Sequence, residues 1–188
     1  MRQNEPKLET ERLRLRFFEL SDGESVRGLA GDKAVSDTTL NIPHPYEKGM
    51  AEEWISTHRI KFEAGESIHF AVVLKTTEEL IGAVSLIIDK GFNRGELGYW
   101  IGKKYWNRGY CTESARAVLD YGFGQLLLNK ITSSHFAGNP SSGRVLSKIG
   151  MKNEGFLKKH VCKHDRFEDL VVYGILRKEW KEENNSRG

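Results

Sequence analysis

The middle of the chain has the pattern of buried strands, and this constrains the fold most. Two apolar runs, 70–74 and 80–88, are separated by a polar stretch of five residues, and a third strand is predicted over 96–101. Apolar runs of this length between turn signals are typical of strands in a sheet. After these strands, apolar residues recur at helical spacing from Thr112 to Leu126. We therefore expect strands followed by a helix in a mixed-sheet α/β layer structure.

The flanking segments predict further strands and helices. The predicted strands cover 11–18, 130–137, 152–158 and 170–176, and the predicted helices cover 22–30, 47–64 and 140–149. Ser21 with Glu24 three residues later indicates a capping box at the first helix, and Gly65 indicates the end of the second. Residues 41–45 contain two prolines, so an extended loop is expected there.

Length and composition indicate one globular domain over 1–188, with an ordered core from about 8 to 180. Hydrophobic residues make up 38% and charged residues 29% of the chain, and no apolar run is long enough to span a bilayer. The first ten residues lack the pattern of a secretory signal. Two cysteines cannot form a disulfide framework in a domain of this size. We expect a cytoplasmic protein without a membrane partner.

One short segment concentrates basic residues. Within fifteen residues lie Lys152, Lys158, Lys159, His160, Lys163, His164 and Arg166. A solvated hairpin and loop is the favoured interpretation, and a docking surface for an acidic partner or for cofactor phosphates is the alternative. The net charge of +3 is too small to predict nucleic-acid binding. His160, Cys162 and His164 offer only three ligands and no CxxC pair, so no metal is expected.

A strand that runs into a helix through a tight loop is the first candidate site. Residues 98–101 are followed by 105–113, where Arg108 and Gly109 form the turn before the helix. The first N–H groups of a helix lack partners and carry partial positive charge, which suits a diphosphate. Gly109 would let the backbone approach that anion closely. The alternative is a plain turn in which Gly109 only supplies a positive φ.

A second helix start follows some thirty residues later. Asn139 is a candidate N-cap and Pro140 fits the first helical position, which explains both without any ligand. Ser142 lies three residues after Asn139, so its hydroxyl can face the same region.

Together, the two segments resemble the cofactor motifs of the GNAT acetyltransferase superfamily, in its RimJ/RimL-type branch. The resemblance covers nearly the whole chain: residues 8–16 resemble the branch's opening strand, 96–101 its splayed fourth strand, and 139–142 its Asn-x-x-Ser element. It implies a single-domain, mixed and mostly antiparallel sheet flanked by helices, with a splayed central strand pair. Cys111 replaces the commoner Ala at the end of the loop, and we expect it to be a buried small hydrophobe rather than a nucleophile.

The resemblance implies an N-acetyltransferase that moves an acetyl group from acetyl-CoA directly to a primary amine, such as a protein N-terminal α-amine. The alternative is a non-catalytic acyl-CoA sensor or partner-binding module of the same fold. The implied acetyl-CoA contacts are Tyr99, Trp100, Ile101, Gly102, Trp106, Asn107, Arg108, Gly109, Tyr110, Cys111, Thr112, Asn139 and Ser142.

Three residues are candidates for proton transfer. Ser142 would protonate the leaving thiolate, and Glu96 would take a proton from the amine through water. His135 is the rival base, since its ordinary pKa of about 6.5 suits neutral pH, although it could be a packed core residue. Glu113 is interpreted as a first-turn helix charge and not as a catalyst.

The pKa of the amine bears on the acceptor. An α-amine with a pKa of about 7.8 needs about 0.5 kcal/mol to be neutral near pH 7.4, whereas a lysine amine at about 10.4 needs about 4 kcal/mol. A site without a strong base therefore suits α-amines. The acceptor should bind beside residues 41–46 and 47–64. Its identity, a ribosomal target, the acyl-chain preference and a homodimer are left open by the sequence.

Overall fold

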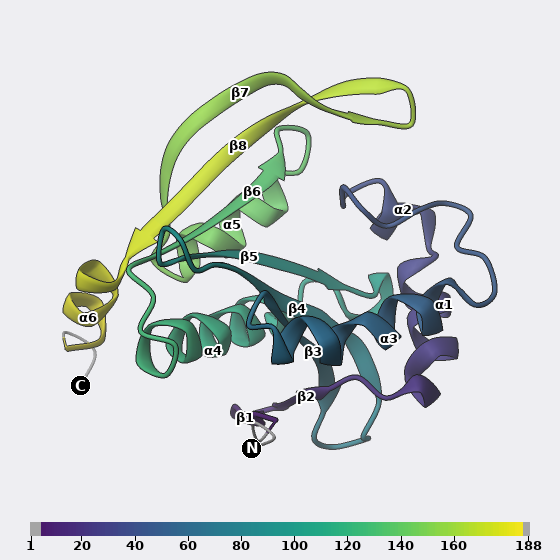
Figure 1. Cartoon of the computed structure of the whole chain (residues 1–188). Helices are drawn as coiled ribbons and strands as arrows, with labels where there is room; N and C mark the ends of the chain where they lie inside the picture. The colour runs from purple at the N-terminus through teal and green to yellow at the C-terminus, as the bar shows by residue number, and fades with distance from the viewer. Residues whose placement is uncertain (1–4, 186–188) are drawn as a thin grey trace.

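The computed structural model describes residues 5–185. Within them, eight strands form one sheet in the order β1-β2-β3-β4-β5-β6-β8-β7 (Figure 1). The strands are β1 (Leu8–Glu9), β2 (Leu13–Phe17), β3 (Ser67–Leu74), β4 (Leu80–Asp89), β5 (Arg94–Ile101), β6 (Lys130–Phe136), β7 (Lys152–Lys163) and β8 (Arg166–Leu176). Neighbouring strands are antiparallel except β5 and β6, which are parallel. The predicted mixed, mostly antiparallel sheet is confirmed.

Six α-helices accompany the sheet: α1 (Gly23–Ala30), α2 (Lys33–Ser36), α3 (Met50–Glu63), α4 (Tyr110–Gly124), α5 (Pro140–Lys148) and α6 (Arg177–Asn185). In this described part of the chain, none of the helices combines the length and apolar character that a membrane span requires. The domain predicted over 1–188 extends into residues 1–4 and 186–188, which lie outside the described residues.

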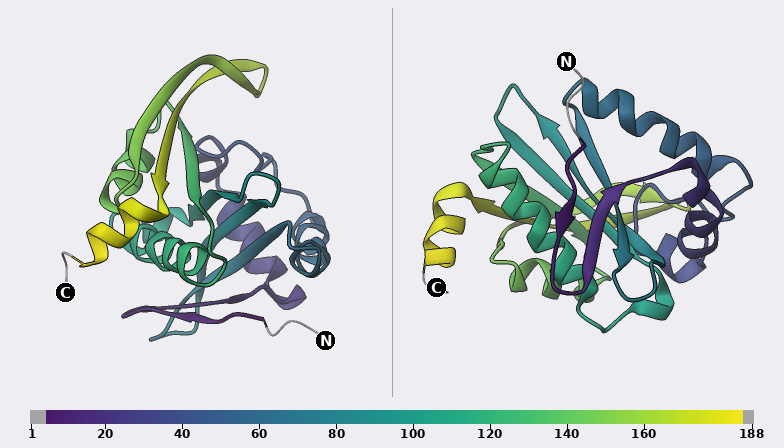
Figure 2. Two further views of the ribbon diagram at one scale, coloured as in Figure 1. Left: turned by 60° about the vertical axis from the view of Figure 1, so that its left-hand side comes forward. Right: turned by 90° about the horizontal axis from the view of Figure 1, so that it is seen from below.

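The central strands are buried on both faces, which explains their nearly continuous apolar sequence. On β3, Phe70 and Val72 pack into the core cluster that contains α4, whereas Ala71 and Val73 pack into the cluster of α1 and α3. Helices α1 and α3 lie on one side of the sheet and α4 on the other (Figure 2).

The sheet opens between β5 and β6. These strands pair only where Arg94, Gly95 and Glu96 oppose residues 130–132. Beyond this point β5 stays paired with β4 as far as Ile101, and β6 stays paired with β8 as far as Phe136. The two central strands therefore splay apart, and backbone groups of β5 that would pair with a neighbour become available to a ligand.

Two local features differ from the sequence expectation. The capping box uses Glu19 and Asp22 instead of Ser21 and Glu24, because the chain forms a 3₁₀ turn over Leu20–Asp22 before α1. The C-terminal hairpin is longer than predicted, since β7 runs to Lys163 and β8 begins at Arg166. Most of β7 is exposed, so its sequence lacks the alternation that would reveal a strand.

Candidate active site

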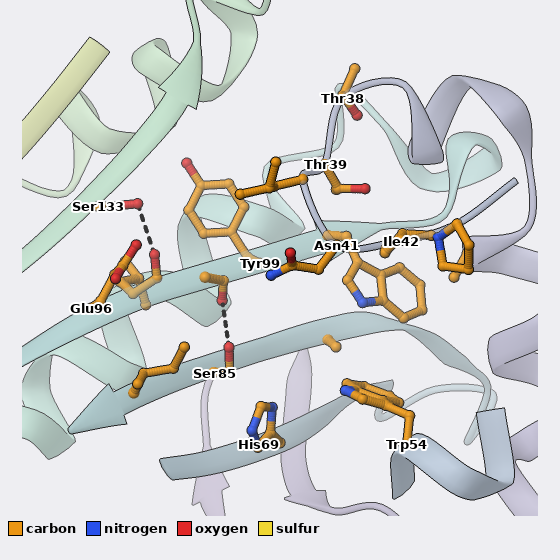
Figure 3. A pocket seen from close by; sticks show the side chains of 18 of the residues that line it. Thr38, Thr39, Asn41, Ile42, Trp54, His69, Ser85, Glu96, Tyr99 and Ser133 are labelled. Atoms are coloured by element: carbon orange, nitrogen blue, oxygen red, sulfur yellow. Dashed lines mark hydrogen bonds between the residues drawn. The ribbon is translucent and has the colours of Figure 1, made fainter. Parts of the chain in front are cut away.

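Two hollows meet where the central strands separate. One, the α4–α5 cleft, has a volume of about 420 Å³ and opens at the N-termini of α4 and α5. The other, the α3 cavity, has a volume of about 650 Å³ and lies between the open end of the sheet, α3 and the loop 38–46 (Figure 3). Tyr99, Trp100, Ser142, Thr38 and Thr39 line both hollows. A molecule in one could therefore react with a molecule in the other.

The wall of the α4–α5 cleft is a loop whose backbone is held in an unusual shape. Gly109 has φ +80°, and Asn107 has φ +61°. The indole N–H of Trp106 donates to the carbonyl of Ile101 at 2.6 Å, which ties the loop to the end of β5. Within residues 5–185, no side chain caps the start of α4 at Gly109. The first N–H groups of this helix are thus free to bind an anion.

Arg12 supports this loop from a distant part of the chain. Its guanidinium lies 4.7 Å from the centre of the Tyr110 ring and donates to the carbonyl of Arg108 at 3.0 Å. Glu113 accepts from the Nε of Arg12 at 2.7 Å and from the hydroxyl of Thr10 at 2.6 Å. Burial alone would raise the pKa of Glu113, but these hydrogen bonds lower it overall. Glu113 therefore has a structural role. No motif in the sequence indicates the role of Arg12.

The start of α5 brings two hydroxyl groups together at the junction of the hollows. Asn139 caps the helix by accepting from the N–H of Ser142 at 3.3 Å, as predicted. The Ser142 hydroxyl lies 2.8 Å from the hydroxyl of Tyr99. Burial raises the pKa of Tyr99 well above its ordinary value, so this phenol stays protonated at neutral pH. The sequence motifs do not indicate a role for this hydroxyl group.

Most residues predicted to contact the cofactor line the α4–α5 cleft, and two do not. Gly102 is buried and donates its N–H to Ile81, and Arg108 lies outside the lining. Arg144 and Lys148, one turn apart on α5, line the cleft and add positive charge that the sequence motifs did not reveal. Burial raises the pKa of Cys111 to about 12, which keeps the thiol neutral and makes it a poor nucleophile.

The two candidate bases occupy different positions around the α3 cavity. Glu96 is exposed and lines the cavity at the last residue of β5 that pairs with β6. His135 is buried, with its Nδ1 2.8 Å from the carbonyl of Phe136. Its Nε2 has no hydrogen-bond partner among the described residues and faces Gly143, where an added Cβ would lie only 2.7 Å away. Glu96 is the more accessible of the two.

A stack of aromatic rings forms the floor of the α3 cavity. His58 and His69 stack at 4.3 Å and 9°, and Trp54 meets His58 edge-on at 4.3 Å. Burial, together with His69 and Lys61, lowers the pKa of His58 to about 3, and burial together with Lys61 lowers that of His69 to about 4. Both imidazoles are therefore neutral at physiological pH. Within residues 5–185, no three His, Cys, Asp or Glu side chains are arranged to hold a metal ion.

The tip of the β7–β8 hairpin holds the loop that covers this cavity. The hairpin arches away from the sheet toward α2 (Figure 1). At its tip, the ammonium of Lys163 donates to the carbonyls of Leu40 at 3.1 Å and Ile42 at 2.5 Å. Burial lowers the pKa of Lys163. One residue of the predicted basic cluster thus contacts the chain's own loop instead of a partner.

The α4–α5 cleft fits the elongated, phosphate-bearing shape of acetyl-CoA. A glycine with positive φ and uncapped N–H groups at α4 provide the place for a pyrophosphate, and Arg144 and Lys148 lie nearby on the cleft wall. The separated edge of β5 offers backbone groups for an amide-containing arm. The thioester end would then reach the junction at Tyr99 and Ser142.

Comparison with known proteins agrees with this geometry. Residues 12–152 match the Acetyltransferase (GNAT) domain family. The N-acetyltransferase YnaD of Bacillus subtilis, whose function is uncharacterised, is 34% identical over 171 residues, which cover 91% of this chain and 97% of YnaD. The alanine N-acetyltransferase of ribosomal protein uS5 from Escherichia coli is 24% identical over 62% of this chain and 61% of its own.

The solved structures lead to the same family. The crystal structure of a GNAT-family acetyltransferase from Bacillus anthracis has a TM-score of 0.82 at 28% identity, covering 92% of this chain and 99% of that one. The chain belongs to the GNAT acetyltransferase family and is an enzyme that transfers an acetyl group from acetyl-CoA to an amine.

Proposed function

We propose that the enzyme acetylates an N-terminal α-amine, with acetyl-CoA in the α4–α5 cleft and the acceptor in the α3 cavity. The observation that carries this proposal is the shared wall of the two hollows at Tyr99, Trp100 and Ser142. An amine entering from the α3 cavity would meet an acetyl group entering from the cleft at that wall. The relation to a ribosomal-protein alanine N-acetyltransferase supports a protein N-terminus as acceptor.

On the cofactor side, backbone groups carry most of the proposed contacts. The N–H groups of 107–112 would bind the pyrophosphate, and residues 99–101 of β5 would pair with the pantetheine arm. The N–H of Gly102 is already used within the sheet, so Gly102 leaves our proposed set. Acetyl-CoA supplies the reactive thioester, and the chain positions it and polarises its carbonyl.

The reaction would proceed by direct attack of the amine nitrogen on the acetyl carbon. The new C–N bond forms, the C–S bond breaks, and the electron pair leaves on the thiolate sulfur. Ser142 would return a proton to that sulfur, and the neighbouring Tyr99 hydroxyl, 2.8 Å away, could replace the proton that Ser142 gives up. Neither hydroxyl needs to form a covalent bond with the acetyl group.

Glu96 is our proposed base. Its carboxylate is exposed within the α3 cavity, where it could accept a proton from the amine through a water molecule. His135 also lines the cavity, but its Nε2 is buried, so it is less accessible to an amine or a water molecule than the Glu96 carboxylate. A carboxylate is a weak base for a lysine ammonium, which again favours an α-amine.

Thiol release from acetyl-CoA tests the proposal, with N-terminal peptides, lysine peptides, polyamines and aminoglycosides as acceptors. We expect N-terminal peptides to react faster than matched lysine peptides. Ser142→Ala and Glu96→Gln should each lower kcat about 100-fold, a usual effect of removing an acid or a base. The acetyl-CoA KM should stay nearly unchanged in Glu96→Gln, because Glu96 lies outside the α4–α5 cleft.

Matched variants separate chemistry from folding. Ser147→Ala removes a hydroxyl on the same helix that bonds only to Gly143 within that helix, and it should keep full activity. A large loss in His135→Gln with little loss in Glu96→Gln would assign the base to His135. CoA binding without turnover of any acceptor would favour the non-catalytic sensor. The expected cytoplasmic location and a homodimer stay predictions.

A further inference from the structure

The α3 cavity has two chemically different ends. Figure 3 shows Glu96 and Ser133 toward one end and Ile42 and Trp54 toward the other, with Tyr99 between them. The end at Glu96 is mixed: it includes the polar side chains of Glu96 and Ser133, with Ile87 opposite Glu96 on the neighbouring strand. The other end is lined mainly by apolar side chains from α1, the loop 38–46, α3 and β5, namely Val26, Ala30, Ile42, Pro43, Tyr46, Met50, Trp54 and Trp100. An acceptor that extends to both sides of Tyr99 must contact both environments.

The apolar end is held rigidly. Trp54 is fixed edge-on against Phe18 at 5.1 Å and against His58 at 4.3 Å. The carbonyl of Ile42 accepts from the hydroxyl of Ser36 at 2.8 Å and from Lys163. Ile42, Trp54 and Trp100 pack on a core cluster but stay only partly buried. Fixed walls of this kind give a ligand a preformed apolar pocket, which is the usual character of a small-molecule subsite.

The charges around the cavity do not match a second cationic group. The lining includes the carboxylates of Glu53 and Glu96 and the ammonium of Lys61. His69 is neutral, since burial and Lys61 lower its pKa to about 4. The proposed function assigns Glu96 to the reacting amine, and the remaining charges of the lining, one from Glu53 and one from Lys61, cancel in sum. A polyamine bound here would therefore place its second ammonium where the lining offers no net negative charge. An apolar group would instead bury apolar side chains of the lining that are partly exposed to solvent, which is favourable.

We propose that the natural acceptor carries an aliphatic or aromatic group on the carbon next to its amine, and that this group binds between Ile42, Trp54 and Trp100. The inference rests on the proposed acetylation of an α-amine and names its substrate class. Trp100 lines both hollows at their shared wall, so a group on the carbon next to the amine reaches the apolar end without a long spacer. A cavity of about 650 Å³ has room for one or two residues of a peptide.

Peptides that differ only in their first residue test this proposal by two readouts. Acetyl transfer gives kcat/KM, and calorimetry gives the Kd of each peptide for the enzyme–CoA complex, whether or not turnover occurs. The first residues are glycine, leucine, phenylalanine and glutamate, with spermidine as a further acceptor. We expect leucine and phenylalanine to exceed glycine at least about tenfold in both readouts, as a hydrophobic pocket ordinarily discriminates.

Two variants of the apolar end, Ile42→Ser and Met50→Ser, should shrink this preference at least about threefold. Ile60→Ser changes an exposed residue of α3 that does not line the cavity, so the preference should persist. Equal binding of all four peptides, or tighter binding of glutamate or spermidine, overturns the inference. Preferential binding of leucine and phenylalanine peptides without turnover retains the subsite and rejects the proposed function instead.

Discussion

The two hollows of the active site are built in opposite ways. The α4–α5 cleft is formed largely by two short segments, 99–112 and 139–148, and by the backbone of a loop and a helix start. The α3 cavity gathers side chains from α1, the loop 38–46, α3 and five strands. A site made from local backbone geometry can serve one constant ligand, and a site made from scattered side chains can vary with its acceptor.

The largest expected difference between the two regions is their response to acid. Burial lowers the folded-state pKa of His58 to about 3 and of His69 to about 4, against about 6.5 in the unfolded chain. Below pH 6.5 these two imidazoles bind protons in the unfolded chain but not in the folded chain. The contribution of these neutral imidazoles to the free energy of unfolding is therefore fully present above pH 6.5 and is lost as the pH falls toward about 4. Each should reduce the free energy of unfolding by up to about 1.4 kcal/mol per pH unit.

Urea unfolding between pH 7.5 and 4.5 measures this slope. His58→Phe keeps a ring against Trp54 but binds no proton, so it should remove about half of the histidine slope. His160→Phe, at an exposed position of β7, should leave the slope unchanged. The pKa of Glu113, on the cofactor side, is lowered, so the stability that its carboxylate contributes is lost only as the pH falls below the ordinary pKa of 4.5. An unchanged slope in His58→Phe would contradict the assignment to this buried pair.

The same contrast explains what could be predicted from the sequence. The order of the main strands and helices, the cap at Asn139 and the loop at Gly109 all depend on residues close together in the chain, whose spacing carries the signal. Arg12 contacts the loop from about a hundred residues away, and the Tyr99 hydroxyl meets Ser142 across 43 positions. Contacts of this kind depend on tertiary packing, so no local sequence pattern predicts them.

The acceptor side was even less accessible to sequence reasoning. The family resemblance places the acceptor beside the loop 41–46 and the following helix, and residues of both line the α3 cavity. Sequence reasoning gave no sign of the stack of His58 on His69, because a histidine at helical spacing and one on a strand are each unremarkable alone. It also missed the length of β7, whose exposed residues have no apolar alternation, and therefore the contact of Lys163 with the loop.

A smaller effect is expected at Gly109, whose backbone we propose to bind the cofactor. Gly109→Ala places a Cβ on a residue with φ +80°, which costs about 1–2 kcal/mol for an L-residue. If the loop relieves this strain by turning its N–H groups away, the KM for acetyl-CoA should rise about 5- to 30-fold. The acceptor KM should not change. Initial-rate kinetics with each substrate varied in turn distinguish the two constants.

Gly124→Ala is the matched control, at the other end of α4. Among the described atoms, none lies within 4 Å of a Cβ added there. This variant should behave as wild type in both constants. An equal rise of both KM values in Gly109→Ala would mean that the loop shapes the acceptor side too, and the division between the two regions would fail.

The smallest expected effect tests the border between the regions. Lys163→Met removes the donor that holds the carbonyls of Leu40 and Ile42, while a long side chain remains. A hydrogen bond of this kind contributes about 1 kcal/mol, so the acceptor KM should rise about fivefold. Lys163→Arg can still donate and should restore most of the affinity, whereas a purely apolar packing role would be served equally well by Met.

The acetyl-CoA KM decides how separate the two regions are. Thr38 and Thr39 belong to the same loop and line both hollows. If Lys163 positions only the part of the loop at Leu40 and Ile42, the acetyl-CoA KM of Lys163→Met stays at the wild-type value. If the loop moves as one body, both KM values rise together. Acetyl-CoA binding would then depend on the tip of the β7–β8 hairpin, acting through this loop. The threonines would in that case couple the order in which the two substrates bind, because the first to fix the loop would prepare the site for the second.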